Sequence, residues 1–164
     1  MNVDFITAIK MFFANYANFK GRSTRAEYWW VVLFMVLVSC VLSMFGIFGT
    51  YISWAFSLAC LIPSLAIGTR RLHDTGKSGW WLVIFYIIMG ACLVWIVTVF
   101  NQSAPGLLTG NAAAAQELAR NSQSIVANLI FPYILLFIFG IWWIVLMCKK
   151  SVPDNQYGPN PYGE

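Results

Sequence analysis

The strongest constraint on this chain is a series of four apolar segments that contain no Asp, Glu, Lys, Arg or His. They cover about residues 28–48, 51–69, 80–100 and 125–148. Each is close to the ~20 residues that a helix needs to cross the ~30 Å hydrocarbon core of a bilayer. A spanning segment must satisfy its own backbone hydrogen bonds, and no alternating strand pattern offers a closed barrel. The sequence therefore predicts an all-α membrane protein with four transmembrane helices in a single membrane domain, 1–164.

Composition supports this assignment. Of the 164 residues, 60% are hydrophobic and only 10% are charged, and the mean hydropathy is +0.71. A soluble domain of this length could not bury so much apolar surface in one core. The net charge of +4 is compatible with nucleic-acid binding, but the cations lie beside apolar segments and form no separate basic domain. We therefore expect anionic phospholipid as the partner, and no nucleic acid.

The distribution of cations predicts the orientation in the membrane. In the four-span topology, one side receives Lys10, Lys20, Arg22, Arg25, Arg70, Arg71, Lys77, Lys149 and Lys150. The other side receives the short link Gly49–Thr50 and the loop 101–124, whose only cation is Arg120. The positive-inside rule then puts both termini and the loop after the second span in the cytoplasm.

Three segments lie outside the predicted spans. Within residues 1–20, a helix-like stripe predicts an amphipathic helix in the cytoplasmic interface, formed by Phe5, Ile6, Ile9, Phe12, Phe13 and Tyr16. A helix packed on a further soluble domain stays open as the alternative. In the outer loop, 101–110 predicts irregular structure and 111–120 a short helix capped by Asn111. The proline-rich segment 149–164 predicts a cytoplasmic tail of turns or extended chain.

The polar stretch RRLHDTGKSGWW, residues 70–81, offers little support for catalysis. Its GKS resembles the end of a phosphate loop, but the first glycine of that motif would fall on Arg71. His73 is the only histidine of the chain, and the four cysteines fall one in each span without CxxC spacing. We expect no catalytic residue, cofactor or metal, and we expect Asp74, Thr75 and Ser78 to cap or turn the chain before the third span.

Three segments of the sequence resemble one known family. The segments are 21–30 (GRSTRAEYWW), 70–81 and 155–161 (NQYGPNP). Together they resemble the YhaH-like bacterial inner-membrane family, a domain of unknown function. The resemblance implies a small multi-helix protein of the bacterial inner membrane and supplies no established reaction. The loop 101–124 is longer than the tight connection expected in shorter relatives.

All three segments fall on the predicted cytoplasmic side, which suggests one assembled surface. We expect an interfacial network that is also a candidate anion-binding site, formed by Arg22, Arg25, Glu27, Arg70, Arg71, His73 and Asp74. A structural clamp, binding of lipid or another anion, and catalysis or transport all stay open for this network.

The favoured function is a non-enzymatic membrane module that binds anionic lipid or a membrane-protein partner. The alternative is a small oligomeric transporter or pore built from several copies of the chain, in which Ser39, Ser43, Ser53, Ser57 and Ser64 would matter. A weaker third class is an enzyme that acts on lipid head groups.

Overall fold

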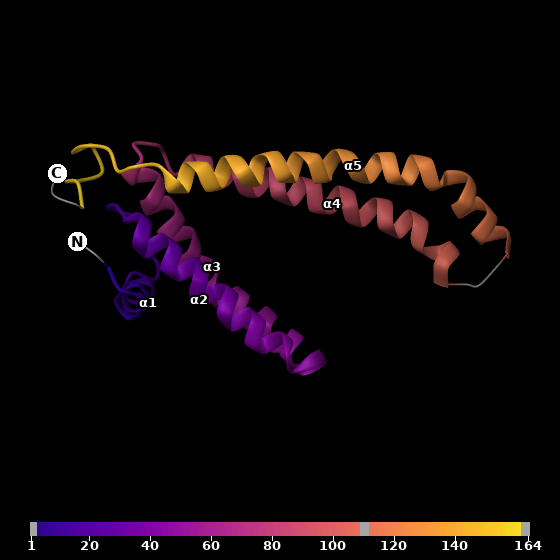
Figure 1. Ribbon diagram of the computed structural model, residues 1–164, viewed down its shortest axis with the longest axis horizontal. Helices are drawn as coiled ribbons and strands as arrows, with labels where there is room; N and C mark the ends of the chain where they lie inside the picture. The colour runs from indigo at the N-terminus through magenta and orange to yellow at the C-terminus, as the bar shows by residue number, and fades with distance from the viewer. Residues whose placement is uncertain (1–2, 109–111, 162–164) are drawn as a thin grey trace. The chain divides into compact units, whose positions relative to one another are not determined.

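The computed structural model describes residues 3–108 and 112–161, and helices are its regular elements throughout these ranges (Figure 1). In chain order they are α1 (Phe5–Ala14), α2 (Arg25–Ser43), α3 (Gly46–Asp74), α4 (Trp80–Leu108) and α5 (Ala112–Cys148). Four segments are long and apolar enough to cross a membrane: Arg25–Ser43, Gly46–Asp74, Trp80–Asn101 and Ser122–Cys148. The prediction of an all-α chain with four such helices is therefore confirmed within the described ranges.

By their internal contacts, the residues fall into two compact units, where the sequence predicts a single membrane domain. The first unit contains residues 1–82 and 146–164, and the second contains residues 83–145. The first unit includes α1 to α3 and the tail after α5, and therefore all the residues of the expected polar network.

The first two spans form a helical hairpin whose turn differs from the prediction. The sequence predicts the link at Gly49–Thr50, whereas α2 ends at Ser43 and α3 already begins at Gly46. The apolar run continues through the turn, so hydropathy alone cannot locate it. Gly46 takes a positive φ of 59°, a conformation that a residue without Cβ adopts at little cost, and this allows the reversal.

Gly49 lies inside α3 and packs closely against the end of α2. A Cβ atom at this position would lie 1.8 Å from the backbone oxygen of Leu42. We expect Gly49→Ala to lower the free energy of unfolding by about 1–3 kcal/mol, because the hairpin must open to admit the methyl group. Thermal unfolding in detergent measures this, with Gly90→Ala as the control, since a Cβ at Gly90 meets nothing within 4 Å. Equal melting temperatures for the two variants would contradict the prediction.

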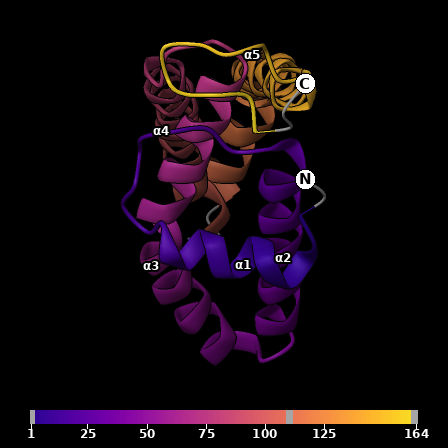
Figure 2. The same cartoon turned by 90° about the vertical axis from the view of Figure 1, so that its left-hand side faces the viewer.

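Helix α1 runs across α2 and α3 and packs on both (Figure 2). Its Phe12 is fully buried in a core with Val31, Cys60 and Ile67. Trp30 of α2 donates to the carbonyl of Val3 at 2.9 Å. The helix is shorter than the predicted segment 1–20. The predicted apolar stripe is covered only in part: Phe12 of α1 is buried, whereas Ile6 and Phe13 of α1 are exposed, as is Tyr16 after its end.

The second unit contains most of α4 and α5, two long antiparallel helices (Figure 1). The rings of Phe85 and Trp143 stack with their centroids 4.3 Å apart, and the Trp95 indole donates to the Asn128 carbonyl at 3.1 Å.

The predicted outer loop 101–124 is wrong over most of its described length. Helix α4 continues to Leu108, and the predicted short helix 111–120 is the beginning of α5 rather than a separate element. Extending an existing helix adds one hydrogen bond for each residue that is fixed, so polar composition alone does not end it. The predicted cap, Asn111, lies outside the described residues.

Candidate functional site

Helix α3 continues five residues beyond the predicted end of its span, through 70–74, and carries these residues into a buried polar cluster. We call Arg22, Arg71 and Asp74 the arginine clamp. The Asp74 side chain is fully buried, and its Oδ1 lies 2.9 Å from Nη2 of Arg22 and accepts from Nε of Arg22 at 3.0 Å. Its Oδ2 forms an ion pair with Nη1 of Arg71, whose side chain is also fully buried. One carboxylate therefore stands between two guanidinium groups.

Arg71 connects the end of α3 to the end of α5. Its Nε donates to the carbonyl of Met147 at 3.0 Å, and its Nη2 donates to the same carbonyl at 2.9 Å and to the carbonyl of Lys149. The last carbonyls of a helix accept no hydrogen bond from within the helix, and they form the negative end of the helix dipole. Arg71 satisfies two carbonyls at the end of α5 and compensates their charge.

Arg22 holds the tail that follows α5. Besides its bonds to Asp74, it donates to the carbonyl of Val152 at 2.6 Å and, through Nη1, to the carbonyls of Pro153 at 3.0 Å and Gly158 at 3.1 Å. The Val152 amide in turn donates to the backbone carbonyl of Asp74 at 3.1 Å. The clamp therefore fixes the tail at Val152–Pro153 and again at Gly158.

His73 takes part in the same tail docking. Its ring stacks on that of Tyr157, with centroids 3.8 Å apart and planes 1° from parallel. Its Nδ1 lies 3.3 Å from the carbonyl of Gly21, and its own carbonyl accepts from the Asn155 side-chain amide at 2.9 Å. The histidine is thus packed between the segment before α2 and the tail.

A second ion pair joins α2 to α3. Nη1 of Arg70 lies 3.4 Å from Oε1 of Glu27, which also accepts from the Ser23 hydroxyl at 3.1 Å. The position of Glu27 follows from the start of α2, where the Thr24 side chain caps the helix by accepting from the Glu27 amide at 3.2 Å. Both charged residues are almost completely buried, with 2% of Glu27 and 4% of Arg70 exposed.

A comparison with known protein families assigns the chain to one of them. Residues 16–109 match the model described as "Protein of unknown function (DUF805)". The chain belongs to this family. This DUF805 protein is 34% identical to the inner membrane protein YhaI of Escherichia coli K12 over 96 residues, which are 56% of this chain and 81% of YhaI. It is 31% identical to the inner membrane protein YhaH of the same strain over 103 residues, 56% of this chain and 83% of YhaH.

A third relative matches over a shorter part of both chains. The uncharacterised protein YiiR of Escherichia coli K12 is 34% identical over 76 residues, which are 43% of this chain and 50% of YiiR. No solved structure matches this DUF805 protein significantly. The family match contains α2 and α3 with both ion-pair groups, and it ends before the tail that Arg22 and His73 hold.

The structure brings the predicted network residues to one end of the first unit, in three arrangements. Arg22, Arg71 and Asp74 form the clamp, Glu27 and Arg70 form the second pair, and His73 stacks on the tail. Arg25 is half-buried at the first position of α2. The prediction that Asp74 caps or turns the chain is wrong, because both of its carboxylate oxygens bind arginine. Ser78 does accept from the Trp80 amide at 3.4 Å, at the start of α4.

Sequence reasoning missed the contribution of the tail. The clamp is completed by the hydroxyl of Ser151, which donates to Asp74, and by the backbone carbonyls of Met147, Lys149, Val152, Pro153 and Gly158. Every residue carries a backbone carbonyl, so a residue pattern does not show which carbonyls accept a hydrogen bond. The signal that was available is the segment 155–161, which belongs to the resemblance and contains the stacking Tyr157.

The arginine clamp holds segments of the chain in position. Its three side chains bind one another and the backbone, with both arginines held by carboxylate and carbonyl oxygens. Among the residues that the structure describes, no group of three His, Cys, Asp or Glu side chains could hold a metal ion.

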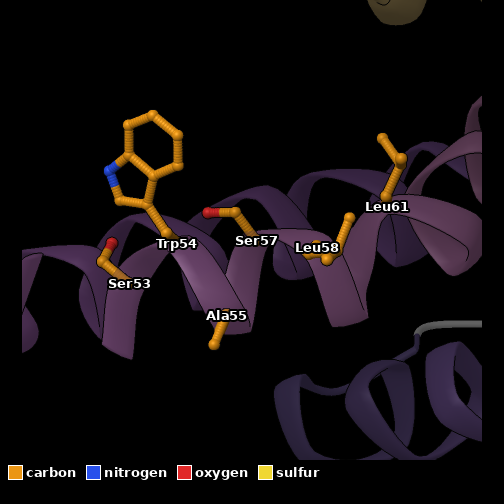
Figure 3. A pocket seen from close by; sticks show the side chains of 6 residues that line it. All are labelled: Ser53, Trp54, Ala55, Ser57, Leu58 and Leu61. Atoms are coloured by element: carbon orange, nitrogen blue, oxygen red, sulfur yellow. The ribbon is translucent and has the colours of Figure 1, made fainter. Parts of the chain in front are cut away.

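A separate groove of about 590 Å³ follows the surface of α3. It is lined by Ser53, Trp54, Ala55, Ser57, Leu58 and Leu61. Trp54, Ser57 and Leu61 project from one side of the helix (Figure 3). Two of the serines expected to matter in a pore, Ser53 and Ser57, therefore lie in one groove.

Proposed function

We propose that this DUF805 protein is a non-enzymatic module of the bacterial inner membrane, and that the arginine clamp holds its helix ends together. The observation that carries the proposal is the fully buried Asp74 between Arg22 and Arg71. Buried charges persist in proteins when they are paired and hydrogen-bonded, as these are. A catalytic acid or base must reach a substrate, whereas these groups bind the chain itself.

The proposed orientation has both termini in the cytoplasm. The positive-inside rule supports it, because every cation except Arg120 lies in the segment up to the start of α2, at the end of α3, in the link to α4 or after α5. In this arrangement, α1 lies in the cytoplasmic interface, where its exposed Ile6 and Phe13, and Tyr16 just after it, contact lipid. The surplus of basic side chains at this end then faces anionic phospholipid or a protein partner.

The alternative function is a small oligomeric transporter or pore. The groove along α3 favours it, because Ser53 and Ser57 place two hydroxyl groups on an otherwise apolar helix surface. Four helices alone seldom enclose a path for a solute. Several copies of the chain could do so, with the groove facing the path.

A reconstitution experiment separates the two functions. The purified chain is inserted into vesicles of phosphatidylethanolamine and phosphatidylglycerol that contain a small fluorescent solute. The membrane module predicts solute retention equal to that of empty vesicles. It also predicts phosphatidylglycerol bound to the protein in native mass spectrometry. Solute leakage that disappears in the variant Ser53→Leu, Ser57→Leu would overturn the module and establish the pore.

A further inference from the structure

Arg70 differs from the two arginines of the clamp in the use of its nitrogen atoms. Its Nε and Nη2 are buried and have no hydrogen-bond partner among the described residues. Only Nη1 faces an acceptor, the Glu27 carboxylate at 3.4 Å. Buried donors without acceptors are rare in folded proteins and point to a missing water or ion. The unused Nε and Nη2 therefore require a partner from outside the described chain.

The clamp arginines offer no such edge. Nε and both terminal nitrogens of Arg22 donate to Asp74 and to the tail, and those of Arg71 bind Asp74 and the end of α5. An anion would have to displace intramolecular acceptors from either residue. At Arg70, the Nε and Nη2 edge of the guanidinium plane is free of protein acceptors.

The charge and the geometry of this edge select the chemical class of the ligand. The ion-paired set Arg22, Arg70, Arg71, Glu27 and Asp74 contains three arginines and two carboxylates, a surplus of one positive charge. Two parallel N–H groups on one side of a guanidinium match two oxygens of a phosphate group. A phosphate group thus satisfies both donors and compensates the surplus charge.

We propose that the Nε and Nη2 edge of Arg70 binds a phosphate group, carried by an anionic phospholipid or free in solution. This inference rests on the proposed membrane location, because it puts Arg70 near the end of the span Gly46–Asp74, where lipid phosphates lie. Both nitrogen atoms are covered by protein, so binding includes a local side-chain movement that uncovers them.

Native mass spectrometry of the full chain with phosphatidylglycerol tests the site. We expect Arg70→Gln to reduce bound lipid by roughly tenfold or more, since it removes a charged bidentate contact. Lys20→Gln, which removes an exposed cation just before α2, should retain lipid within about twofold. Because Arg70→Gln leaves Glu27 buried without its counter-charge, the double variant Glu27→Gln, Arg70→Gln repeats the test with a neutral pair. Lipid retention by both Arg70 variants would overturn phosphatidylglycerol as the source of the phosphate.

A spectroscopic measurement on the unaltered sequence distinguishes the two sources of phosphate. The chain is labelled with ¹⁵N-arginine and placed in phosphatidylcholine nanodiscs, and the Arg70 Nε resonance is assigned by its absence in Arg70→Lys. A shift on exchange into phosphatidylglycerol nanodiscs identifies the lipid, and a shift on adding inorganic phosphate identifies the free anion. An unchanged resonance in both cases means that water occupies the edge, which overturns the proposal. Solute leakage from vesicles together with an Arg70 shift would overturn the proposed module and leave this site standing.

Discussion

Asp74→Asn should lower the free energy of unfolding by about 3–5 kcal/mol, because it leaves two buried guanidinium groups without their shared counter-charge. Asparagine keeps the shape of the side chain but carries no charge, so Arg22 and Arg71 then repel each other in a site that excludes water. Unfolding in detergent, followed by labelling of the buried Cys60 thiol, measures the loss. Cys60 lies in the core beside Phe12, so its labelling reports the opening of the first unit.

The matched control is Asp154→Asn in the tail. Asp154 is exposed, and its Oδ1 accepts from the Asn160 amide at 2.8 Å, a role that an amide oxygen can also fill. We expect a change within about 0.5 kcal/mol. If the two variants had the same effect, Asp74 would not act as the counter-charge of the clamp.

Truncation after Lys150 should cost about 2–4 kcal/mol, because it removes the acceptors that hold Arg22. The tail supplies three carbonyls to Arg22, the Ser151 hydroxyl to Asp74 and the Tyr157 ring to His73. The melting temperature of the truncated chain in detergent gives the direction of the effect, and chemical unfolding gives its size.

A double-mutant cycle shows whether the tail acts through Arg22. Arg22→Gln should cost less in the truncated chain than in the full chain, with a coupling of at least about 1 kcal/mol. Lys20→Gln, two residues away and exposed, should be additive with truncation. Additive effects for both residues would mean that the tail stabilises the first unit by another route.

The helices themselves could be predicted because hydropathy is a local property. A run such as 80–100 has no charge and reaches the length of a span, and the structure places α4 over it. Ends were harder to predict. The prediction stopped the second span before Arg70 because charge is costly in lipid, but α3 continues to Asp74 since its charged residues find partners there. The turn before Gly46 was missed because the residues around it are as apolar as the helices.

The membership of the polar network could be predicted in outline, but its pairing could not. From the sequence, the arginines could be grouped by their predicted side of the membrane but could not be distinguished from one another. In the structure, all the guanidinium nitrogens of Arg71 bind Asp74 or carbonyls at the end of α5. Its neighbour Arg70 pairs with Glu27, and two of its nitrogen atoms have no hydrogen-bond partner among the described residues. Adjacent residues on a helix point about 100° apart, so their partners come from different elements.

By itself, the sequence predicted the class of the protein: four apolar helices long enough to span a membrane, the segments in which the cations gather, and the residues from which a polar site could be built. These properties depend on composition and on spacing within about 20 residues. Only the tertiary structure decided which charges meet. Arg22 reaches Asp74 across 52 positions and the Pro153 carbonyl across 131 positions. Such contacts depend on how the helices pack and on backbone carbonyls that every residue carries, so no residue pattern specifies them.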